Sequence, residues 1–154
     1  MPRVHVSVLI DAPRDQVWAA VEDIASHVDW MLDAEAIRFV TAQRAGVGTA
    51  FDCDTKVGPF RLTDRMTVVR WEPRRAMHVR HEGLITGTGG FTLKRSRRRR
   101  TRFVWDEPLR FPWYFGGPLG ALAAKPVLTA IWKRSLANLK AKVEGDAIPP
   151  AARR

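Results

Sequence analysis

The fold is decided by the segment VHVSVLIDAPRDQVW, residues 4–18. Its first half alternates apolar and polar side chains, with Val4, Val6 and Ile10 on one side, and a period of two is typical of a strand with one buried face. Pro13 follows, and proline suits the first turn of a helix because its missing N–H would have no partner there. The segment therefore predicts a strand that leads directly into a helix.

The predicted helix carries an apolar stripe at helical spacing, made of Val17, Val21, Ile24 and Val28. Ser26 and Asp29 resemble a capping box, in which a side chain at the start of a helix accepts a hydrogen bond from its first turn. We therefore expect the helix to break near Ser26 and a second short helix to follow.

A series of short strands is expected next. Their predicted ranges are 36–42, 49–57, 61–71 and 76–82, then a strand that begins at Phe91, and finally 101–107. Gly58-Pro59 and Pro73 mark turns between them, and Gly87, Gly89 and Gly90 are expected to loosen the chain before Phe91. Short strands joined by turns at these spacings predict an antiparallel meander.

The last part of the chain changes to a helical pattern from Gly117 onward. Its single apolar stripe consists of Leu128, Trp132, Leu136, Leu139 and Val143. Pro126 is expected either to begin a new helical segment or to kink a longer helix. The predicted fold class is α+β: a curved antiparallel sheet of about seven strands, wrapped around a long C-terminal helix, with two short helices after the first strand. We expect a single domain over residues 1–144 and a disordered tail over 145–154.

Composition limits the class of protein. The 154 residues suit one domain, and no apolar run is long enough to cross a membrane. The N-terminus lacks the apolar core of a signal peptide, and Cys53 has no cysteine partner, so a reducing cytoplasm is expected. The chain has 26 basic and 16 acidic residues, a formal charge of +10. This excess favours weak contact with polyanions or acidic lipid surfaces. Genome composition and a need for solubility are the alternative explanation, and we prefer it.

Several motifs resemble one known group of proteins. They are Ile10-Asp11-Ala12-Pro13 with Val17-Trp18, the Asp29-Trp30 corner, Gly48-Thr49-Ala50-Phe51, Trp71-Glu72-Pro73, and Ser135-Leu136-Ala137-Asn138-Leu139-Lys140. Their order from about Val4 to Val143 resembles the START-like, helix-grip superfamily, and in particular its polyketide cyclase/dehydrase-like branch, often called SRPBCC. The resemblance implies a β-α-α-β6-α fold around a deep, largely apolar cavity. Its members bind lipids, sterols, quinones or polyketides, and some are cyclases or hydrolases. They share a cavity rather than a reacting group, so the resemblance does not assign a function.

The residues expected to surround a bound ligand are apolar positions on the inward faces of the strands and the last helix: Phe51, Met66, Val79, Phe91, Phe103, Trp105, Leu128 and Trp132. Four aromatic residues, Phe111, Trp113, Tyr114 and Phe115, precede the last helix and are expected at the cavity mouth. They would form a hydrophobic lid or a wedge that touches a membrane. The alternative is that they plug one end of the core.

Three titratable residues share a strand face with apolar neighbours: Asp64, His81 and Glu107. Inside a cavity they could serve as general acids or bases, because burial disfavours the charged form of a carboxylate. The alternative is that each is paired with a neighbouring arginine at a sheet end, such as Arg65, Arg80 or Arg102.

Other chemistries find little support in the sequence. The four histidines and Cys53 do not have the spacing of a metal site, and there is no phosphate-binding loop, so we expect neither metal nor cofactor. The basic run from Arg95 to Arg102 could hold phosphates of lipid headgroups or of nucleic acid, or form a solvated hairpin tip. Nucleic acid is the less favoured partner, because the nearby Phe91 and Phe103 fit the buried face.

Three hypotheses follow, in order of preference. The first is binding or carriage of a small hydrophobic or amphipathic ligand, such as a lipid, polyketide or quinone. The second is a cyclase, dehydratase or hydrolase in which Glu107 or His81 shuttles protons. The third is a module that binds an anionic membrane surface through the arginine run and the aromatic segment. The sequence leaves the ligand and the oligomeric state open.

Overall fold

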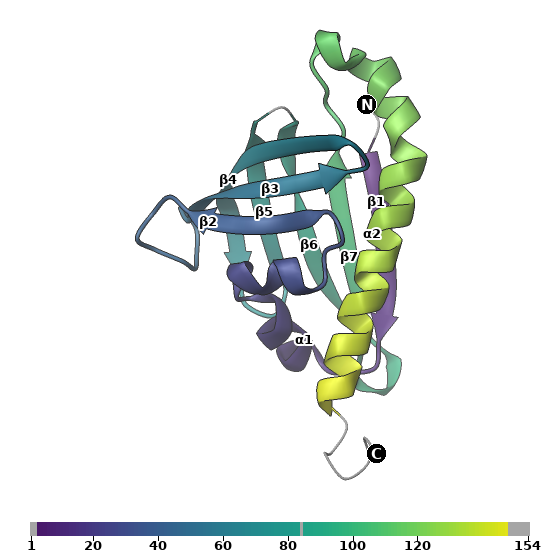
Figure 1. Cartoon of the computed structure of the whole chain (residues 1–154). Helices are drawn as coiled ribbons and strands as arrows, with labels where there is room; N and C mark the ends of the chain where they lie inside the picture. Colours follow the sequence, from purple (N-terminus) through teal and green to yellow (C-terminus); the bar gives the residue numbers. More distant parts are fainter. Residues whose placement is uncertain (1–2, 84, 148–154) are drawn as a thin grey trace.

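A computed structural model describes residues 3–83 and 85–147. Seven strands form one antiparallel sheet in the order β1-β7-β6-β5-β4-β3-β2 (Figure 1). The strands are β1 (Arg3–Ile10), β2 (Ala34–Phe39), β3 (Ala50–Val57), β4 (Phe60–Glu72), β5 (Ala76–Glu82), β6 (Thr86–Ser96) and β7 (Arg100–Pro108). The helices are α1 (Arg14–Val21) and α2 (Gly117–Ala147), with short 3-10 helices η1 (Ile24–Asp29), η2 (Arg97–Arg99) and η3 (Trp113–Phe115).

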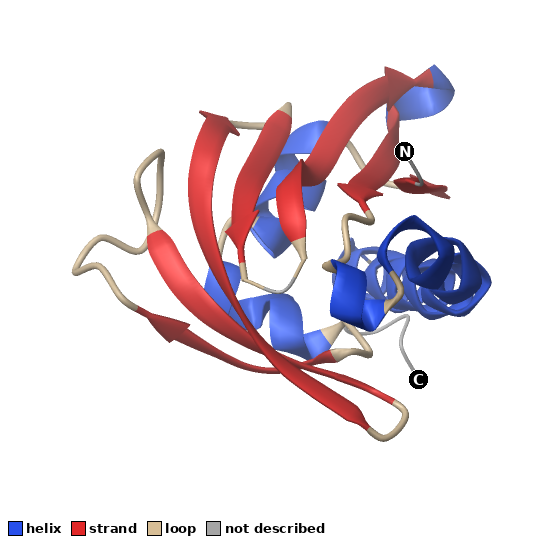
Figure 2. Cartoon of the chain, turned by 90° about the horizontal axis from the view of Figure 1, so that it is seen from above, coloured by secondary structure: helices blue, strands red, loops and turns tan. Residues whose placement is uncertain are grey.

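The sheet curls, and α2 runs along its β1 side (Figure 2). Each strand pairs with the next one along the chain, except that β1 joins β7, with Val4 opposite Glu107 and Val6 opposite Trp105. The predicted α+β helix-grip architecture is therefore confirmed. None of the helices in the described ranges is long and apolar enough to cross a membrane.

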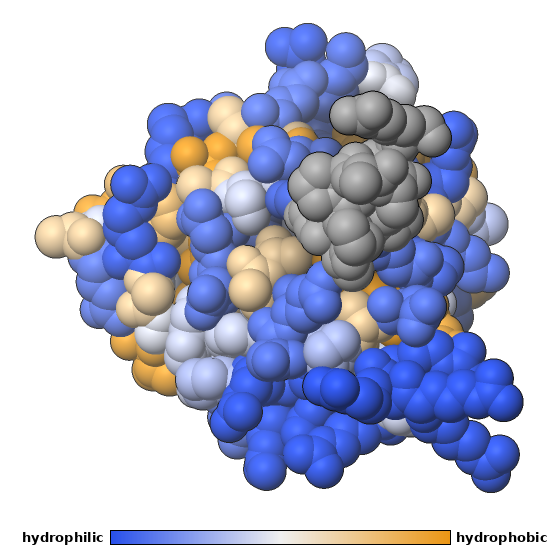
Figure 3. Space-filling view, turned by 90° about the horizontal axis from the view of Figure 1, so that it is seen from below, coloured by the Kyte–Doolittle hydropathy of each residue, from blue (hydrophilic) through white to orange (hydrophobic). Residues whose placement is uncertain are grey.

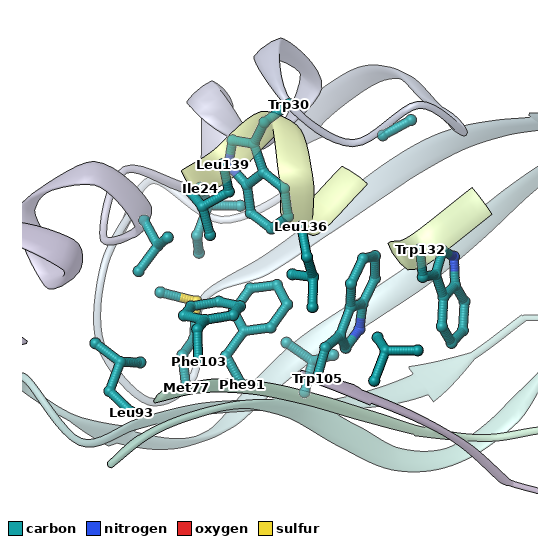
Figure 4. Close-up of a cluster of buried hydrophobic side chains, with 14 of the residues drawn as sticks. Ile24, Trp30, Met77, Phe91, Leu93, Phe103, Trp105, Trp132, Leu136 and Leu139 are labelled. Carbon is teal, nitrogen blue, oxygen red and sulfur yellow. The ribbon is translucent and has the colours of Figure 1, made fainter. Parts of the chain in front are cut away.

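An aromatic cluster forms the core between η1, the sheet and α2 (Figure 4). Trp30 is 1% exposed, and its ring centroid lies 5.7 Å from that of Phe91 and 6.2 Å from that of Phe103. Leu136 and Leu139 of α2 cover the cluster from the other side and are fully buried. Burying large side chains of this kind supplies about 1.5–3 kcal/mol each. The cluster therefore fixes α2 against the sheet at the η1 end.

The first helix differs from the prediction. It ends at Val21, and the next helical segment, η1, is capped by Asp23, whose side chain accepts a hydrogen bond from the Ala25 backbone N–H at 3.2 Å. Ser26 lies inside η1 and its hydroxyl donates to the Asp23 carbonyl oxygen at 2.6 Å. The predicted Ser26 cap was wrong because η1 already begins at Ile24, where the Asp23 carboxylate accepts from the Ala25 N–H of the first turn.

Three strand and helix bounds also differ. The second strand begins two residues earlier than predicted and ends at Phe39. Gly87, Gly89 and Gly90 lie within β6 rather than before it, where they are paired with β5. The last helix passes through Pro126 without ending and reaches Ala147, so residues 145–147, expected in the tail, are helical. The rest of the predicted tail, 148–154, lies outside the described residues.

Candidate functional site

A cavity of about 460 Å³ lies between the concave face of the sheet and α2. Its size falls within the range of about 300–1,000 Å³ that is typical of small-molecule sites. Seven of the eight predicted pocket residues line it: Phe51, Met66, Val79, Phe91, Trp105, Leu128 and Trp132. The wall is mostly apolar, with side chains from β2 to β7 on one side and from α2 on the other.

Phe103 does not line the cavity, although it was predicted to do so. It is fully buried beneath Trp30 and lies 5.0 Å from Phe91, ring centroid to ring centroid (Figure 4). It shares the inward face of β7 with Trp105, but it lies two residues nearer the η1 end. The alternation of side chains along β7 correctly predicted that Phe103 faces inward. Its position along the strand places it in the packed core instead of the cavity.

The four aromatic residues expected at the mouth fall into two pairs. Phe111 and Phe115 line the cavity. Trp113 and Tyr114 do not, because they project from η3 into solvent with 86% and 63% of their surface exposed. Phe60, the first residue of β4, lines the cavity and is also 60% exposed, so it belongs to the same rim. The segment is therefore not a plug of the core.

The cavity wall contains one linked polar cluster, and it consists of the three predicted titratable residues. Nδ1 of His81 lies 2.7 Å from Oδ2 of Asp64, and Nε2 of His81 lies 2.7 Å from Oε2 of Glu107. All three side chains are at least nine-tenths buried and line the cavity. The imidazole is thus held between two carboxylates, each at charge-assisted hydrogen-bond distance.

Two glycines make room for this cluster. His81 is on β5 and Glu107 is on β7, so the Glu107 side chain has to cross over β6, which lies between them. A Cβ at Gly89 of β6 would overlap the Glu107 carboxylate, and a Cβ at Gly83 would overlap the Asp64 carboxylate. The glycine-rich sequence of β6 is therefore what allows a side chain to reach across a strand.

The alternative, in which arginines pair with these residues, is wrong. Arg65 pairs with Asp52, Arg80 pairs with Glu82 at 2.8 Å, and Arg102 donates to the Ser7 hydroxyl at 3.4 Å. Arg65 and Arg80 are next in sequence to Asp64 and His81, and Arg102 is five residues from Glu107 on the same strand. Residues an odd number apart on a strand point to opposite faces of the sheet, so these arginines face away from the cavity.

His81 is charged at neutral pH. Burial alone lowers the pKa of His81, but the hydrogen bonds and negative charges of Asp64 and Glu107 outweigh it and raise the pKa to about 10. Both ring nitrogens then carry protons and donate them to the carboxylates. In this state His81 has the properties of an acid or an electrostatic stabiliser.

A second carboxyl site, which the sequence analysis missed, faces the same cavity. The indole N–H of Trp132 donates to Oδ2 of Asp33 at 3.0 Å, and that of Trp105 donates to Oε1 of Glu107 at 3.1 Å. The two indole rings stack, with centroids 4.6 Å apart. Burial raises the pKa of Asp33, and the Trp132 hydrogen bond partly opposes this. Asp33 lies in the bend between η1 and β2, where no strand periodicity predicts its direction.

Two further lining residues carry no charge near neutral pH. Burial lowers the pKa of His27 to about 4, and its Nε2 lies 2.7 Å from the Val21 carbonyl oxygen. Burial likewise raises the pKa of the Cys53 thiol to about 11. Within residues 3–83 and 85–147, no set of His, Cys, Asp and Glu side chains is arranged to hold a metal ion.

The arginine run forms the tip between β6 and β7, around η2, as predicted. Strongly hydrophilic side chains gather on this end of the molecule, which Figure 3 shows from below. β7 begins at the tip and ends shortly before η3, and its 9 residues span about 26 Å. The arginine tip and the aromatic rim therefore lie at opposite ends of the sheet (Figure 1).

Comparisons with known proteins agree with this architecture. The family described as "Polyketide cyclase / dehydrase and lipid transport" matches residues 1–144. No curated protein sequence matches the chain.

Solved structures share the fold at low identity. A protein of Thermus thermophilus is 16% identical with a TM-score of 0.78, over 96% of this chain and 100% of the other. The Zhui aromatase/cyclase of a Streptomyces species is 21% identical with a TM-score of 0.71, over 96% of each chain. DynU16, a protein of the dynemicin biosynthetic locus, is 21% identical with a TM-score of 0.64, over 92% of this chain and 47% of the other.

Proposed function

Because the chain belongs to the polyketide cyclase / dehydrase and lipid transport family, we propose that it binds a small, mostly apolar molecule in the cavity between the sheet and α2. The observation that carries this proposal is the cavity itself, about 460 Å³ in volume with an aromatic and aliphatic wall. A ligand buried there gains roughly 25 cal/mol per Å² of apolar surface before ordering costs are subtracted.

The polar cluster gives the ligand an orientation. His81, Asp64 and Glu107 occupy one part of an otherwise apolar wall, so a ligand with one polar end would place that end against them. A few convergent polar groups in an apolar cavity are typical of sites that fix a ligand in one pose. The preferred ligand is therefore amphipathic rather than a pure hydrocarbon.

The ligand is proposed to enter at the aromatic rim. Phe60, Phe115 and Val127 line the cavity and are all substantially exposed, so they connect its interior with solvent. The exposed Trp113 and Leu119 extend the apolar surface around this opening. An apolar rim of this kind lowers the cost of moving an apolar molecule from a membrane or a partner into the cavity.

A cavity-filling variant tests the binding proposal. Ala124 of α2 lines the cavity, and Ala137 of the same helix is exposed and does not. Binding of the neutral fluorescent probe N-phenylnaphthylamine should be lost in Ala124→Trp and retained in Ala137→Trp. Equal binding by the two variants would contradict the cavity as the binding site.

A second candidate function is acid–base catalysis of the cyclase or dehydratase type. The cluster favours it, because a protonated imidazole beside two carboxylates places an acid and two candidate bases within one shielded cavity. In such a reaction His81 would donate a proton to a leaving hydroxyl or a carbonyl oxygen, and Glu107 or Asp64 would remove one from carbon.

Catalysis is tested with a bicyclic β-hydroxyketone as the substrate. Loss of water from this compound gives a conjugated, α,β-unsaturated ketone, which is followed by its ultraviolet absorbance. Turnover should depend on pH and disappear in His81→Gln and in Glu107→Gln. Turnover unchanged in both variants, with their fold intact by circular dichroism, would reject this function. Contact with an anionic membrane and a cytoplasmic setting stay predictions.

A further inference from the structure

The side-chain N–H donors of His81, Trp105 and Trp132 in the cavity wall already form hydrogen bonds with carboxylates of the protein itself. Both N–H groups of His81 face Asp64 and Glu107, the indole N–H of Trp105 donates to Glu107, and that of Trp132 donates to Asp33. A ligand group that needs a hydrogen bond from this cluster would have to displace one of these bonds. Such displacement leaves a buried carboxylate oxygen without a partner, which is costly.

One acceptor of the cluster remains unpaired. Oδ1 of Asp64 is one of two buried side-chain polar atoms that lack a hydrogen-bond partner within the described residues. The other is Nε1 of Trp30, which lies in the aromatic core rather than in the cavity wall. Asp64 is 7% exposed and lines the cavity. A buried oxygen that carries negative charge calls for a donor.

The charge of the cavity also distinguishes between ligands. The chain carries 26 basic residues, yet no lysine or arginine of the described ranges lines the cavity. Its acidic groups are Asp33, Asp64 and Glu107, and His81 supplies one positive charge that lies between two carboxylates. A basic surface thus encloses an interior with an excess of acidic groups, where repulsion is little screened by solvent.

We propose that the ligand presents a neutral hydrogen-bond donor, a hydroxyl or phenol group, to Asp64, and that the cavity excludes ligands whose polar end is a carboxylate or a phosphate. This deepens the proposed ligand-binding function and rests on it. Free fatty acids and acyl phosphates are thereby excluded, whereas hydroxylated aromatic and alicyclic compounds are retained. The carboxylate of Asp64 accepts the ligand's hydrogen bond, and His81 holds this carboxylate in place through Oδ2.

Three ligands of one size test the proposal by displacement of N-phenylnaphthylamine at about pH 7, where naphthoate is ionised and naphthol is not. Naphthol donates a hydrogen bond, methoxynaphthalene keeps the oxygen but has no donor, and naphthoate adds a negative charge. We expect naphthol to bind about tenfold more tightly than methoxynaphthalene, because hydrogen bonds to charged groups are the stronger kind. Naphthoate should bind about tenfold more weakly than methoxynaphthalene, or not at all.

The outcomes separate this inference from the proposed function. If methoxynaphthalene binds in the cavity but naphthol binds no better, or naphthoate binds as well, the inference is overturned and the binding function stands. If the probe binds but none of the three ligands displaces it, the inference is overturned and the binding function stands. If the probe itself does not bind in the cavity, both fail.

A variant pair then identifies the acceptor. Asp64→Asn should erase the preference for naphthol over methoxynaphthalene. Asp52→Asn removes the same charge from a partly exposed carboxylate paired with Arg65 and should keep that preference. A preference that survives in Asp64→Asn would contradict Asp64 as the acceptor. The comparison of ligands on the unaltered protein keeps the proposal falsifiable if Asp64→Asn does not fold.

Discussion

Glu107 on β7 accepts a hydrogen bond from His81 on β5 across the intervening strand β6, at 2.7 Å between Oε2 and Nε2. The contact ties together three strands on the concave face, and Asp64 on β4 extends it to a fourth. Strands that form a cavity wall have no packed neighbour on that side to hold them. The cluster therefore braces the sheet where the apolar core is absent, in addition to any role in binding.

The first prediction concerns the pH dependence of stability. The pKa of His81 rises from an ordinary value of 6.5 to about 10 on folding, so the folded protein binds this proton more tightly than the unfolded chain. The stabilisation is fully present below pH 6.5 and is lost as the pH rises through 10. Urea unfolding from about pH 6 to about pH 10 should show a fall in the free energy of unfolding that His81→Gln lacks.

A histidine outside the cluster serves as the control for this prediction. Removing His81 leaves two buried carboxylates without their donor, so His81→Gln should lose about 3–5 kcal/mol near neutral pH. His5, on the exposed side of β1, is the matched position, and His5→Gln should retain the pH dependence of the unaltered protein. Identical pH profiles for the unaltered protein and His81→Gln would mean that His81 is not charged in the folded state.

The second prediction concerns the glycine that lets Glu107 cross β6. A Cβ at Gly89 would lie 2.5 Å from the Asp106 carbonyl oxygen and would also overlap the Glu107 carboxylate. Gly89→Ala should therefore cost about 1–3 kcal/mol of unfolding free energy and break the His81–Glu107 hydrogen bond. Thermal unfolding and the chemical shifts of the His81 ring protons measure the two effects separately.

Gly145 provides the control for this substitution. A Cβ there meets no atom within 4 Å, and Gly145 lies inside α2. Alanine is the better helix former, so Gly145→Ala should leave stability unchanged or raise it by up to about 1 kcal/mol. Equal tolerance of alanine at both positions would show that β6 does not need Gly89 for side-chain clearance.

The sequence predicted the fold because its patterns are local. Alternation in β1, the proline before α1 and the stripe from Leu128 to Val143 each depend on the period of a single element, and each is confirmed. The order of the motifs along the chain also predicted membership of the START-like, helix-grip superfamily. This prediction is confirmed by the family match over residues 1–144.

The site was only partly predictable, because it depends on distances between strands. Strand parity placed Asp64, His81 and Glu107 on the inward face, but their mutual hydrogen bonds require the strand order and the absent side chain of Gly89. Asp33 was missed because it lies in a bend without periodicity. The glycines of β6 were interpreted as a loop, since glycine weakens a strand unless a neighbouring group needs its space.

The third prediction concerns the second carboxyl of the cavity. Trp132→Phe keeps most of the stacked ring but removes the N–H that donates to Asp33 at 3.0 Å. An unpaired buried carboxylate costs about 1–3 kcal/mol, and the pKa of Asp33 should rise further. Urea unfolding should show a loss that grows as the pH rises above 3.8, the ordinary pKa of an aspartate. Trp113 is 86% exposed, so Trp113→Phe is expected to change stability by less than about 0.5 kcal/mol.

The fourth prediction concerns the left-handed backbone conformation of Arg98 at the arginine tip between β6 and β7. Arg98 has a φ of 59°, in the left-handed region that costs a non-glycine residue about 1–2 kcal/mol. Arg98→Gly removes this strain, and it should raise the free energy of unfolding relative to Arg97→Gly, which removes the same charge at a position without positive φ. The expected difference between the two variants is about 1 kcal/mol, measured by urea unfolding. If Arg97→Gly proved as stable as Arg98→Gly, the left-handed turn at the β6–β7 tip would not form in solution.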